Sequence, residues 1–230
     1  MPAFDLVIFE TATFELNKMD TVPVPIQLPN LPEDYPDYSS LEYWTSRHQM
    51  ELKEVESSSL TDMMMHVQEE WYLNIDELLK AMFKVQNFFD ESHYQLSDAE
   101  ICILGTGFSD ISAQLVSRGF SNIVNIDYSQ PSMDFQNSLR DQSSDKDYAE
   151  SVDFICKDIR DSERLMEQQD DFRLVIDKAC LDCVACSSNL GDMCIAVENV
   201  HRILESGGSY LLVSRAGPLS RLWLFQTTEN

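Results

Sequence analysis

From residue 101 onward, short apolar runs alternate with segments whose apolar residues recur at helical spacing. Such runs, bounded by turn-forming residues, are typical of buried strands, and the helical spacing is typical of helices packed on one face. The runs predict strands at 101–104, 122–127, 152–156, 172–177 and 209–214, and the segments between them predict helices at 109–118, 129–140, 160–168 and 192–205. This alternation favours right-handed crossovers, so we predict an α/β fold with a doubly wound, mostly parallel sheet.

The first part of the chain has a different pattern. Prolines recur between Pro23 and Pro36, which favours extended, irregular backbone. We therefore divide the chain into a Pro-rich N-terminal extension, residues 1–36, and one domain, residues 37–230. Helices are predicted at 41–56 and 74–89, the second with an apolar stripe on one face. Phe4–Phe9 could form a strand, but the sequence supplies no partner for it.

Three further segments complete the predicted elements. Asp141–Asp153 is acidic and rich in serine, which predicts a solvated loop. Gly207 and Gly208 are predicted to end the last long helix. Pro218–Phe225 predicts a short helix near the end of the chain.

A glycine turn follows the first of the predicted parallel strands. Gly105 and Gly107 allow a tight turn and leave room beside the backbone, and Ser109 is a predicted N-cap of the next helix. Asp127 ends the second strand, about 20 residues further on, where nucleotide-binding folds place an acid that binds ribose hydroxyls. The unit predicts a site for a nucleoside-containing cofactor at the carboxyl ends of the strands.

Asp110 bears on which cofactor this is. It occupies the third glycine position of a dinucleotide-binding turn, where a carboxylate would repel a pyrophosphate on the helix N-terminus. S-adenosylmethionine has no phosphate and avoids this repulsion, so we favour it as the cofactor. A dinucleotide, or a glycine turn that serves packing alone, remains open at this point. The chain contains no P-loop sequence.

Composition limits the partners. Sixteen basic residues against 40 acidic ones give a net charge of −24, which disfavours nucleic acid and membrane and favours a basic protein partner. No apolar run is long enough to span a bilayer, and the first residues lack the basic pattern of a targeting segment. A cytoplasmic location is the resulting expectation.

Cysteines raise a competing hypothesis. Cys180, Cys183 and Cys186 form a Cys-x-x-Cys-x-x-Cys run, and Cys194 follows. This spacing could hold zinc or an iron–sulfur cluster, but no second cysteine or histidine pair completes a typical site. We expect no metal. A metal protein would contain stoichiometric zinc or iron after purification.

Several motifs recur together in the order typical of one family. They are Glu-Tyr-Trp-Thr-Ser-Arg-His at 42–48, Leu-Gly-Thr-Gly-Phe-Ser at 104–109, Ile-Asp-Tyr-Ser at 126–129, Asp-Ile-Arg at 158–160, Val-Ile-Asp-Lys-Ala-Cys-Leu-Asp at 175–182, and a Gly-Gly ahead of Val-Ser at 213–214. Over roughly residues 38–225 the chain resembles the class I, seven-strand methyltransferases that include the elongation factor 1-alpha lysine methyltransferases. The resemblance implies S-adenosylmethionine as cofactor and a lysine of a protein, such as elongation factor 1-alpha, as substrate.

The resemblance also implies a set of cofactor residues. Trp44 and His48 would cover the cofactor, Gly105 and Gly107 would approach its methionine part, and Lys178 would lie near that end. Asp127 would bind the ribose, with Tyr128 beside the adenine, and Asp158 and Ile159 would hold the adenine edge and face. For the catalytic role we predict Asp177 and Asp182, because a nearby carboxylate could orient the substrate amine and accept its proton.

Two departures from the family pattern affect the substrate half of the site. Ala179 and Cys180 stand where the family has Gly-Thr. The family also continues past the fifth parallel strand into a helix and an antiparallel hairpin, for which the residues after Ser214 are too few. We therefore expect the domain to lack this hairpin and the fifth strand to be an exposed edge. Two alternatives remain: a non-catalytic binding protein of the same fold, or a methyltransferase that acts on another protein or a small molecule.

Overall fold

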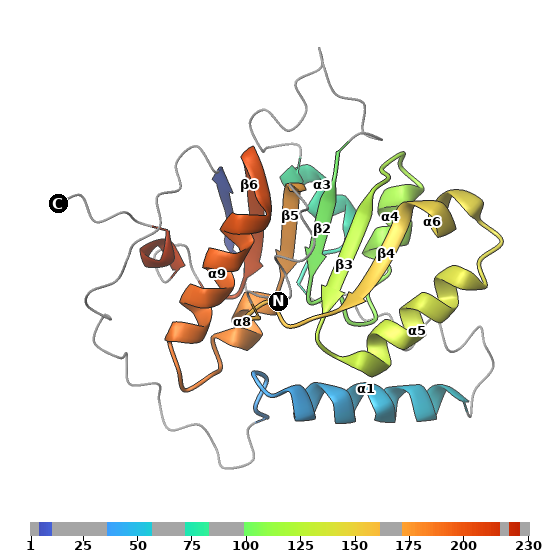
Figure 1. Ribbon diagram of the computed structural model, residues 1–230, viewed down its shortest axis with the longest axis horizontal. Helices are drawn as coiled ribbons and strands as arrows, with labels where there is room; N and C mark the ends of the chain where they lie inside the picture. The colour runs from blue at the N-terminus through green and yellow to red at the C-terminus, as the bar shows by residue number, and fades with distance from the viewer. Residues whose placement is uncertain are drawn as a thin grey trace.

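A six-stranded sheet forms the centre of the protein (Figure 1), with strand order β1-β6-β5-β2-β3-β4. The computed structural model describes residues 5–10, 36–56, 72–82, 99–161, 172–216 and 221–225. The strands are β1 (Asp5–Glu10), β2 (Ile101–Leu104), β3 (Ile123–Asp127), β4 (Val152–Cys156), β5 (Phe172–Lys178) and β6 (Leu204–Ser214). All neighbouring pairs are parallel except β1 and β6. The predicted α/β class and mostly parallel sheet are confirmed.

The strand register places the predicted motifs side by side. Leu104, the last residue of β2, lies opposite Ile126 of β3 and Asp177 of β5. Connections from β2 lead outward through β3 to β4, and the chain then returns to the other side of β2 to form β5 and β6. Open sheets of this kind bind ligands beyond the carboxyl ends of their strands at such a switch point.

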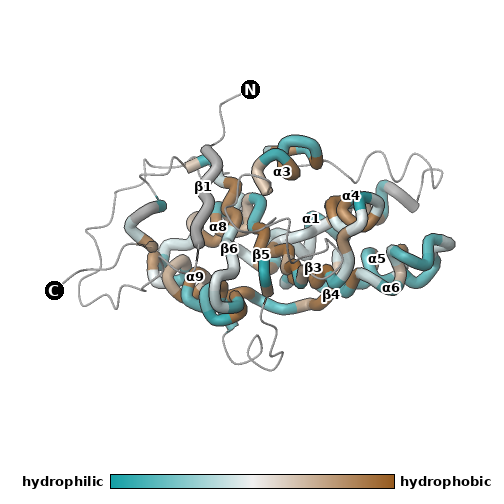
Figure 2. Tube along the Cα trace, turned by 90° about the horizontal axis from the view of Figure 1, so that it is seen from above, coloured by the Kyte–Doolittle hydropathy of each residue, from teal (hydrophilic) through white to brown (hydrophobic). Residues whose placement is uncertain are grey.

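Helices cover both faces of the sheet, and the sheet separates two apolar cores. The described helices are α1 (Leu41–Glu56), α3 (Ile75–Met82), α4 (Ile111–Val116), α5 (Gln130–Asp141), α6 (Lys146–Ser151), α8 (Cys180–Val184), α9 (Gly191–Ile203) and the 3₁₀ turn η3 (Leu222–Leu224). Ile101 and Ile103 of β2 pack in one core with α3 and α4, whereas Cys102 and Leu104 pack in the other with α9. Figure 2 shows the hydrophobic residues gathered in the central strands and hydrophilic ones along α5 and α6.

Several predicted boundaries are wrong. The last long helix ends at Ile203, and Gly207 and Gly208 lie within β6. A Cβ at Gly208 would lie 2.8 Å from the carbonyl oxygen of Phe172, so close approach of two strands, rather than a helix stop, requires this glycine. The predicted helix at 109–118 is the six-residue α4, with Asp110 rather than Ser109 at its N-cap.

The predicted loop at 141–153 is also wrong in part. It contains α6, because the Asp145 side chain caps that helix by accepting a hydrogen bond from the Tyr148 N–H. Of the predicted helix at 160–168, residues 162–168 lie outside the described residues, as do residues 83–89 of the helix at 74–89 and residues 218–220 of the final one.

Strand β1 corrects the prediction of an exposed edge. It pairs antiparallel with β6 along its whole length, from Asp5 opposite Ser214 to Glu10 opposite Ser209. The fifth parallel strand is therefore covered by a segment of the predicted extension. Among the described residues after β6, the structure contains the turn η3 and no strand. No helix in the described part of the chain has the length and apolar character needed to cross a membrane.

Proline substitution tests the β1–β6 pairing. Successive N–H groups of a strand point to opposite sides. Val7→Pro combined with Ile8→Pro therefore removes at least one N–H that donates a hydrogen bond to a carbonyl oxygen of β6. We expect the free energy of unfolding to fall by about 1–3 kcal/mol, measured by urea denaturation. Val7→Ala with Ile8→Ala, which keeps both N–H groups, is the control. Equal stability of the proline and alanine variants would contradict the pairing.

Candidate cofactor site

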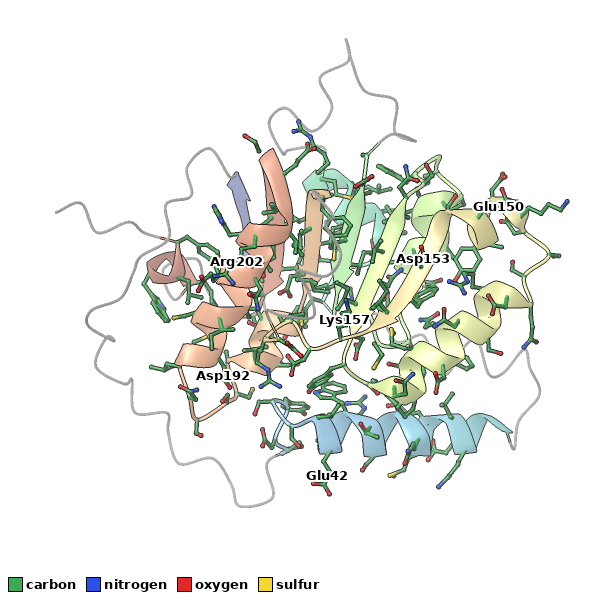
Figure 3. The ribbon with its side chains drawn as sticks, viewed as in Figure 1. Glu42, Glu150, Asp153, Lys157, Asp192 and Arg202 are labelled. Carbon is green, nitrogen blue, oxygen red and sulfur yellow. The ribbon has the colours of Figure 1, made fainter. Side chains whose placement is uncertain are left out.

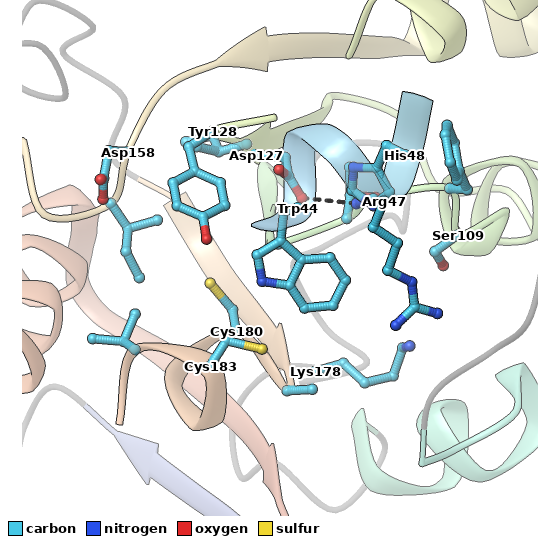
Figure 4. Close-up of a pocket in the computed structure, with 18 of the residues that line it drawn as sticks. Trp44, Arg47, His48, Ser109, Asp127, Tyr128, Asp158, Lys178, Cys180 and Cys183 are labelled. Atoms are coloured by element: carbon cyan, nitrogen blue, oxygen red, sulfur yellow. Dashed lines mark hydrogen bonds between the residues drawn. The ribbon is translucent and has the colours of Figure 1, made fainter. Parts of the chain in front are cut away.

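A cavity of about 330 Å³ opens at the carboxyl ends of the central strands, and α1 lies along one side of it (Figure 4). Every residue predicted to contact the cofactor lines this cavity: Trp44, His48, Gly105, Gly107, Asp127, Tyr128, Asp158, Ile159 and Lys178. They come from segments more than 130 residues apart in the chain. The fold thus brings the predicted cofactor residues together, and their contact with a cofactor stays a prediction.

Asp127 is the buried carboxylate of the cavity. Its Oδ2 accepts a hydrogen bond from the Gly107 N–H at 2.9 Å, and its Oδ1 accepts one from the Ser129 N–H at 2.8 Å. Burial raises the pKa of this carboxyl to about 6, against the effect of the backbone donors, which lower it. Each carboxylate oxygen has a second lone pair, so Asp127 can accept further hydrogen bonds from a ligand in the cavity.

The glycine turn is held in a shape that a side chain would disturb. Gly105 and Gly107 have φ values of +63° and +49°. A Cβ at Gly105 would lie 2.8 Å from the Cβ of Cys180, and a Cβ at Gly107 would lie 3.7 Å from the His48 ring. Gln136 of α5 also holds the turn in place, because its Nε2 donates hydrogen bonds to the carbonyl oxygens of Gly107 and Ser109.

His48 joins α1 to the start of α5, just after β3. The ring is 5% exposed, and its Nδ1 lies 2.7 Å from the Ser129 hydroxyl. Burial, with a smaller effect from Arg47, lowers its pKa to about 4, so the imidazole is neutral at pH 7. His48 also packs against Trp44 and Phe108, at centroid distances of 5.5 and 4.7 Å. On this side the cavity wall is therefore made of aromatic rings, and the His48 ring among them carries no charge at pH 7.

The cavity is also lined by residues of α1 whose role the motifs did not indicate. They are Arg47, Glu51 and Glu54. Arg47 binds Glu51 at 2.7 Å, and its guanidinium lies 5.4 Å from the centroid of the Trp44 ring. Helical spacing from Trp44 and His48 could have revealed these positions, because residues three and four apart share one face of a helix. Lys178 at the end of β5 lines the same cavity (Figure 4).

The segment after β5 has Ala179 and Cys180 where the resembled family has Gly-Thr, and the backbone conformation at Ala179 shows the effect of this change. Ala179 adopts a left-handed φ of 75°, a conformation that the glycine expected there would adopt with less strain. Cys180 and Cys183 of α8 line the cavity, and burial raises the pKa of both thiols, so they remain protonated. Over the residues that the structure describes, no group of three or more histidine, cysteine or acidic side chains is arranged to hold a metal ion.

Asp177 and Asp182, the predicted catalytic residues, are outside the cavity lining. Asp177 is fully buried and accepts hydrogen bonds from the Tyr210 hydroxyl at 2.7 Å and from the Leu181 N–H. Burial raises its pKa to about 7. These contacts tie β5 to α8 and β6.

Asp182 accepts hydrogen bonds from several elements at once. Its donors are the Tyr72 hydroxyl, the Ser214 hydroxyl, the Arg215 N–H and the Arg221 guanidinium. It therefore joins α8 to the end of β6 and to the last described segment. The catalytic role of both carboxylates stays a prediction, and their contacts are those of groups that hold β5, α8 and the end of β6 together.

Sequence comparison identifies related proteins over part of their length. The chain is 31% identical over 119 residues to the methyltransferase srdJ of Neurospora crassa, covering 51% of this chain and 49% of that protein. It is 26% identical over 190 residues to the eEF1A lysine and N-terminal methyltransferases of Bos taurus and Homo sapiens, covering 81% of this chain and 23% of each of theirs. Its sequence relatives are methyltransferases. No protein-family model matches the chain.

The relatives differ from this chain in length. It spans about half of the Neurospora protein and about a quarter of the mammalian ones. Solved structures with a partial likeness are the magnesium protoporphyrin IX methyltransferase ChlM from Synechocystis with bound SAM (TM-score 0.46, 12% identity, 76% of this chain and 74% of that one) and the glycopeptide N-methyltransferase MtfA (TM-score 0.44, 11% identity, 66% and 60%). The fold assignment rests on the strand order described above.

Proposed function

We propose that this chain is an S-adenosylmethionine-dependent methyltransferase that methylates a lysine of a protein substrate, such as elongation factor 1-alpha. The observation that carries the proposal is the cavity itself, in which the buried carboxylate of Asp127 and the N–H of Gly107 meet at the strand ends beside the aromatic residues of α1. The sequence relatives, named as methyltransferases, support the same class of reaction.

The residues present fit this cofactor better than a dinucleotide. Asp127 would accept hydrogen bonds from the ribose hydroxyls, and Tyr128, Asp158 and Ile159 would surround the base. Asp110 is the N-cap residue of α4, and its side chain accepts a hydrogen bond from Gln114. Its negative charge lies at the helix N-terminus, where the pyrophosphate of a dinucleotide would bind. When bound, S-adenosylmethionine supplies an electrophilic methyl group on a positively charged sulfur.

The chain's own contribution would be to position the reactants and to exclude water. Trp44 and neutral His48 would close the cavity on the α1 side, where the positive charge of Arg47 is paired with Glu51. Lys178 would meet the carboxylate of the methionine part. Transfer to an amine in line with the methyl group needs no covalent intermediate, so holding both groups in place would supply most of the rate. The amine must be neutral, and Asp177 and Asp182 stay the predicted carboxylates for that step.

The surface favours a basic protein as substrate. Acidic residues outnumber basic ones by 40 to 16. Exposed acids such as Glu42, Glu150 and Asp153 lie on separate elements around the molecule (Figure 3). A negative field raises the rate at which a positively charged partner is encountered. A substrate such as elongation factor 1-alpha would place the reaction in the cytoplasm.

A methyl-transfer assay tests the proposed function. Cell extract is incubated with purified chain and methyl-labelled S-adenosylmethionine, and labelled proteins are separated by size. We expect a labelled band that the Asp127→Asn variant fails to produce. Acid hydrolysis of the band should release methylated lysine. Binding of the cofactor without any labelled product would favour the non-catalytic alternative, and labelling that survives the substitution would refute the placement of the ribose site.

Cofactor affinity should depend on pH through Asp127. Burial raises the folded pKa to about 6, so the carboxylate gains a proton as the pH falls through that value and then loses its charge and part of its accepting capacity. We expect affinity to be constant above pH 7 and to fall by up to about tenfold per pH unit below pH 6. Calorimetric titration between pH 5 and 8 measures this. The Asp127→Asn variant should lack that fall, and a wild-type affinity independent of pH would contradict the role of Asp127.

A further inference from the structure

Arg160 holds the carboxylate of Asp158 at one end of the cavity. Its Nε lies 2.9 and 3.1 Å from the two carboxylate oxygens, and its Nη2 lies 2.7 Å from Oδ2. The backbone N–H of Arg160 donates to Oδ1 of the same group at 2.9 Å. Both residues line the cavity. Because planar, multiply bonded pairs of this kind are directional, Arg160 fixes the orientation of the Asp158 carboxylate.

The pair is held in turn by α9 and by Tyr128. Arg160 Nη1 lies 3.5 Å from Oδ2 of Asp192, at the start of α9, and Asn199 of α9 donates to the carbonyl oxygen of Ile159 at 2.8 Å. The Arg160 guanidinium lies 5.9 Å from the centroid of the Tyr128 ring. The contacts with α9 hold one side of the segment that follows β4, and the other side of this segment lines the cavity.

This arrangement determines what kind of group Asp158 can recognise. A carboxylate bound to a guanidinium offers only acceptor lone pairs. The two Asp158 oxygens accept from three N–H groups of Arg160, and the Nε–H is shared between them, so of about four lone-pair sites one is left for a ligand. It favours a ligand that presents an N–H donor at this point and disfavours one that presents a carbonyl oxygen. Amino and oxo purines differ in this way at position 6 of the ring, and the neighbouring N1 changes from an acceptor in the amino form to an N–H donor in the oxo form. The Asp158 side chain is 33% exposed, and a base bound against it would cover it. An analogue that lacks the donor would then cover the remaining acceptor site without giving it a hydrogen bond, and would bind less tightly.

We propose that Arg160 is a positioning residue that sets the base preference of the cavity, so that a 6-amino purine is bound in preference to a 6-oxo purine. The inference rests on the proposed function, because it assumes that a nucleoside cofactor occupies this cavity. Arg160 acts through Asp158 and is not itself assigned to the reaction.

The test compares two ligands that differ only at position 6 and the adjoining N1, S-adenosylhomocysteine and S-inosylhomocysteine, by calorimetric titration. For the wild-type chain we expect the adenosyl ligand to bind more tightly by at least about tenfold. Arg160→Gln should reduce that ratio to about twofold or less. Arg160→Lys, which keeps the charge but not the planar pair of donors, should give an intermediate ratio. Arg140→Gln is the matched control, because Arg140 binds Asp141 and Asp153 outside the cavity.

Each outcome decides the proposal. An unchanged ratio with equal weakening of both ligands would mean that Arg160 serves folding alone, and tighter adenosyl binding by Arg160→Gln would mean that it competes with the base. Either result overturns the inference and leaves the proposed function standing. Failure of the wild-type chain to bind either ligand would overturn both. If Arg160→Gln does not fold, as judged by circular dichroism, the Arg160→Lys ratio decides.

Discussion

Replacing Asp127 by asparagine should weaken the binding of S-adenosylmethionine by roughly 100-fold or more. The substitution keeps the size of the side chain but removes the charge and one of the two acceptor oxygens that bind the Gly107 and Ser129 N–H groups. Hydrogen bonds to a charged group contribute about 1.5–3 kcal/mol each and neutral ones about 1 kcal/mol, so the loss of one bond to a ribose hydroxyl and of the charge on the other corresponds to roughly this factor.

Calorimetry on the two proteins measures the effect, and a matched variant separates it from a general loss of negative charge. Asp153 lies on the neighbouring strand β4, is exposed, and does not line the cavity. Asp153→Asn should therefore bind the cofactor like the wild type. If Asp127→Asn keeps its secondary structure and binds within threefold of wild type, the ribose role of Asp127 is wrong.

Gly105→Ala should destabilise the fold by about 2–5 kcal/mol and abolish cofactor binding at the same time. Its φ of +63° costs an L-residue about 1–2 kcal/mol, and its Cβ would lie 2.8 Å from the Cβ of Cys180. Overpacking of this kind costs about 1–3 kcal/mol more, because the clash is with an atom bonded directly to the backbone. The turn and α8 would have to separate at the point where both line the cavity.

Two variants show whether the clash or the backbone conformation is responsible. Gly119→Ala has a positive φ of +93° but no atom within 4 Å of the new Cβ, so it should cost only about 1 kcal/mol in urea denaturation. Adding Cys180→Gly to Gly105→Ala removes the opposing Cβ and should recover part of the lost stability. Equal destabilisation by Gly105→Ala and Gly119→Ala would show that the contact with Cys180 does not matter.

The sequence predicted the parallel part of the sheet well because its central strands β2 and β5 are buried on both faces. Continuous apolar runs such as 101–104 and 172–177 have few other interpretations once helical segments separate them. Gly105 and Asp127 follow from the same pattern, since the carboxyl ends of neighbouring parallel strands meet at one edge. That the predicted cofactor residues line one cavity was therefore predictable from local pattern and motif order.

Other features depend on contacts between distant residues, which local pattern does not contain. The pairing of β1 with β6 joins Asp5 to Ser214, and nothing near either end specifies the partner. The contacts of Asp182 are of the same kind, because its donors lie on elements that only the fold brings together. The start of β6 at Leu204 was missed because a glycine pair predicts a helix end as readily as a close strand contact.

The most direct test of the central claim is a calorimetric titration of the purified chain with S-adenosylmethionine at pH 7.5. We expect one binding site per chain with a dissociation constant on the order of micromolar, weakened roughly 100-fold or more in Asp127→Asn. A folded chain that gives no binding heat, and no displacement in equilibrium dialysis, at millimolar cofactor would contradict it.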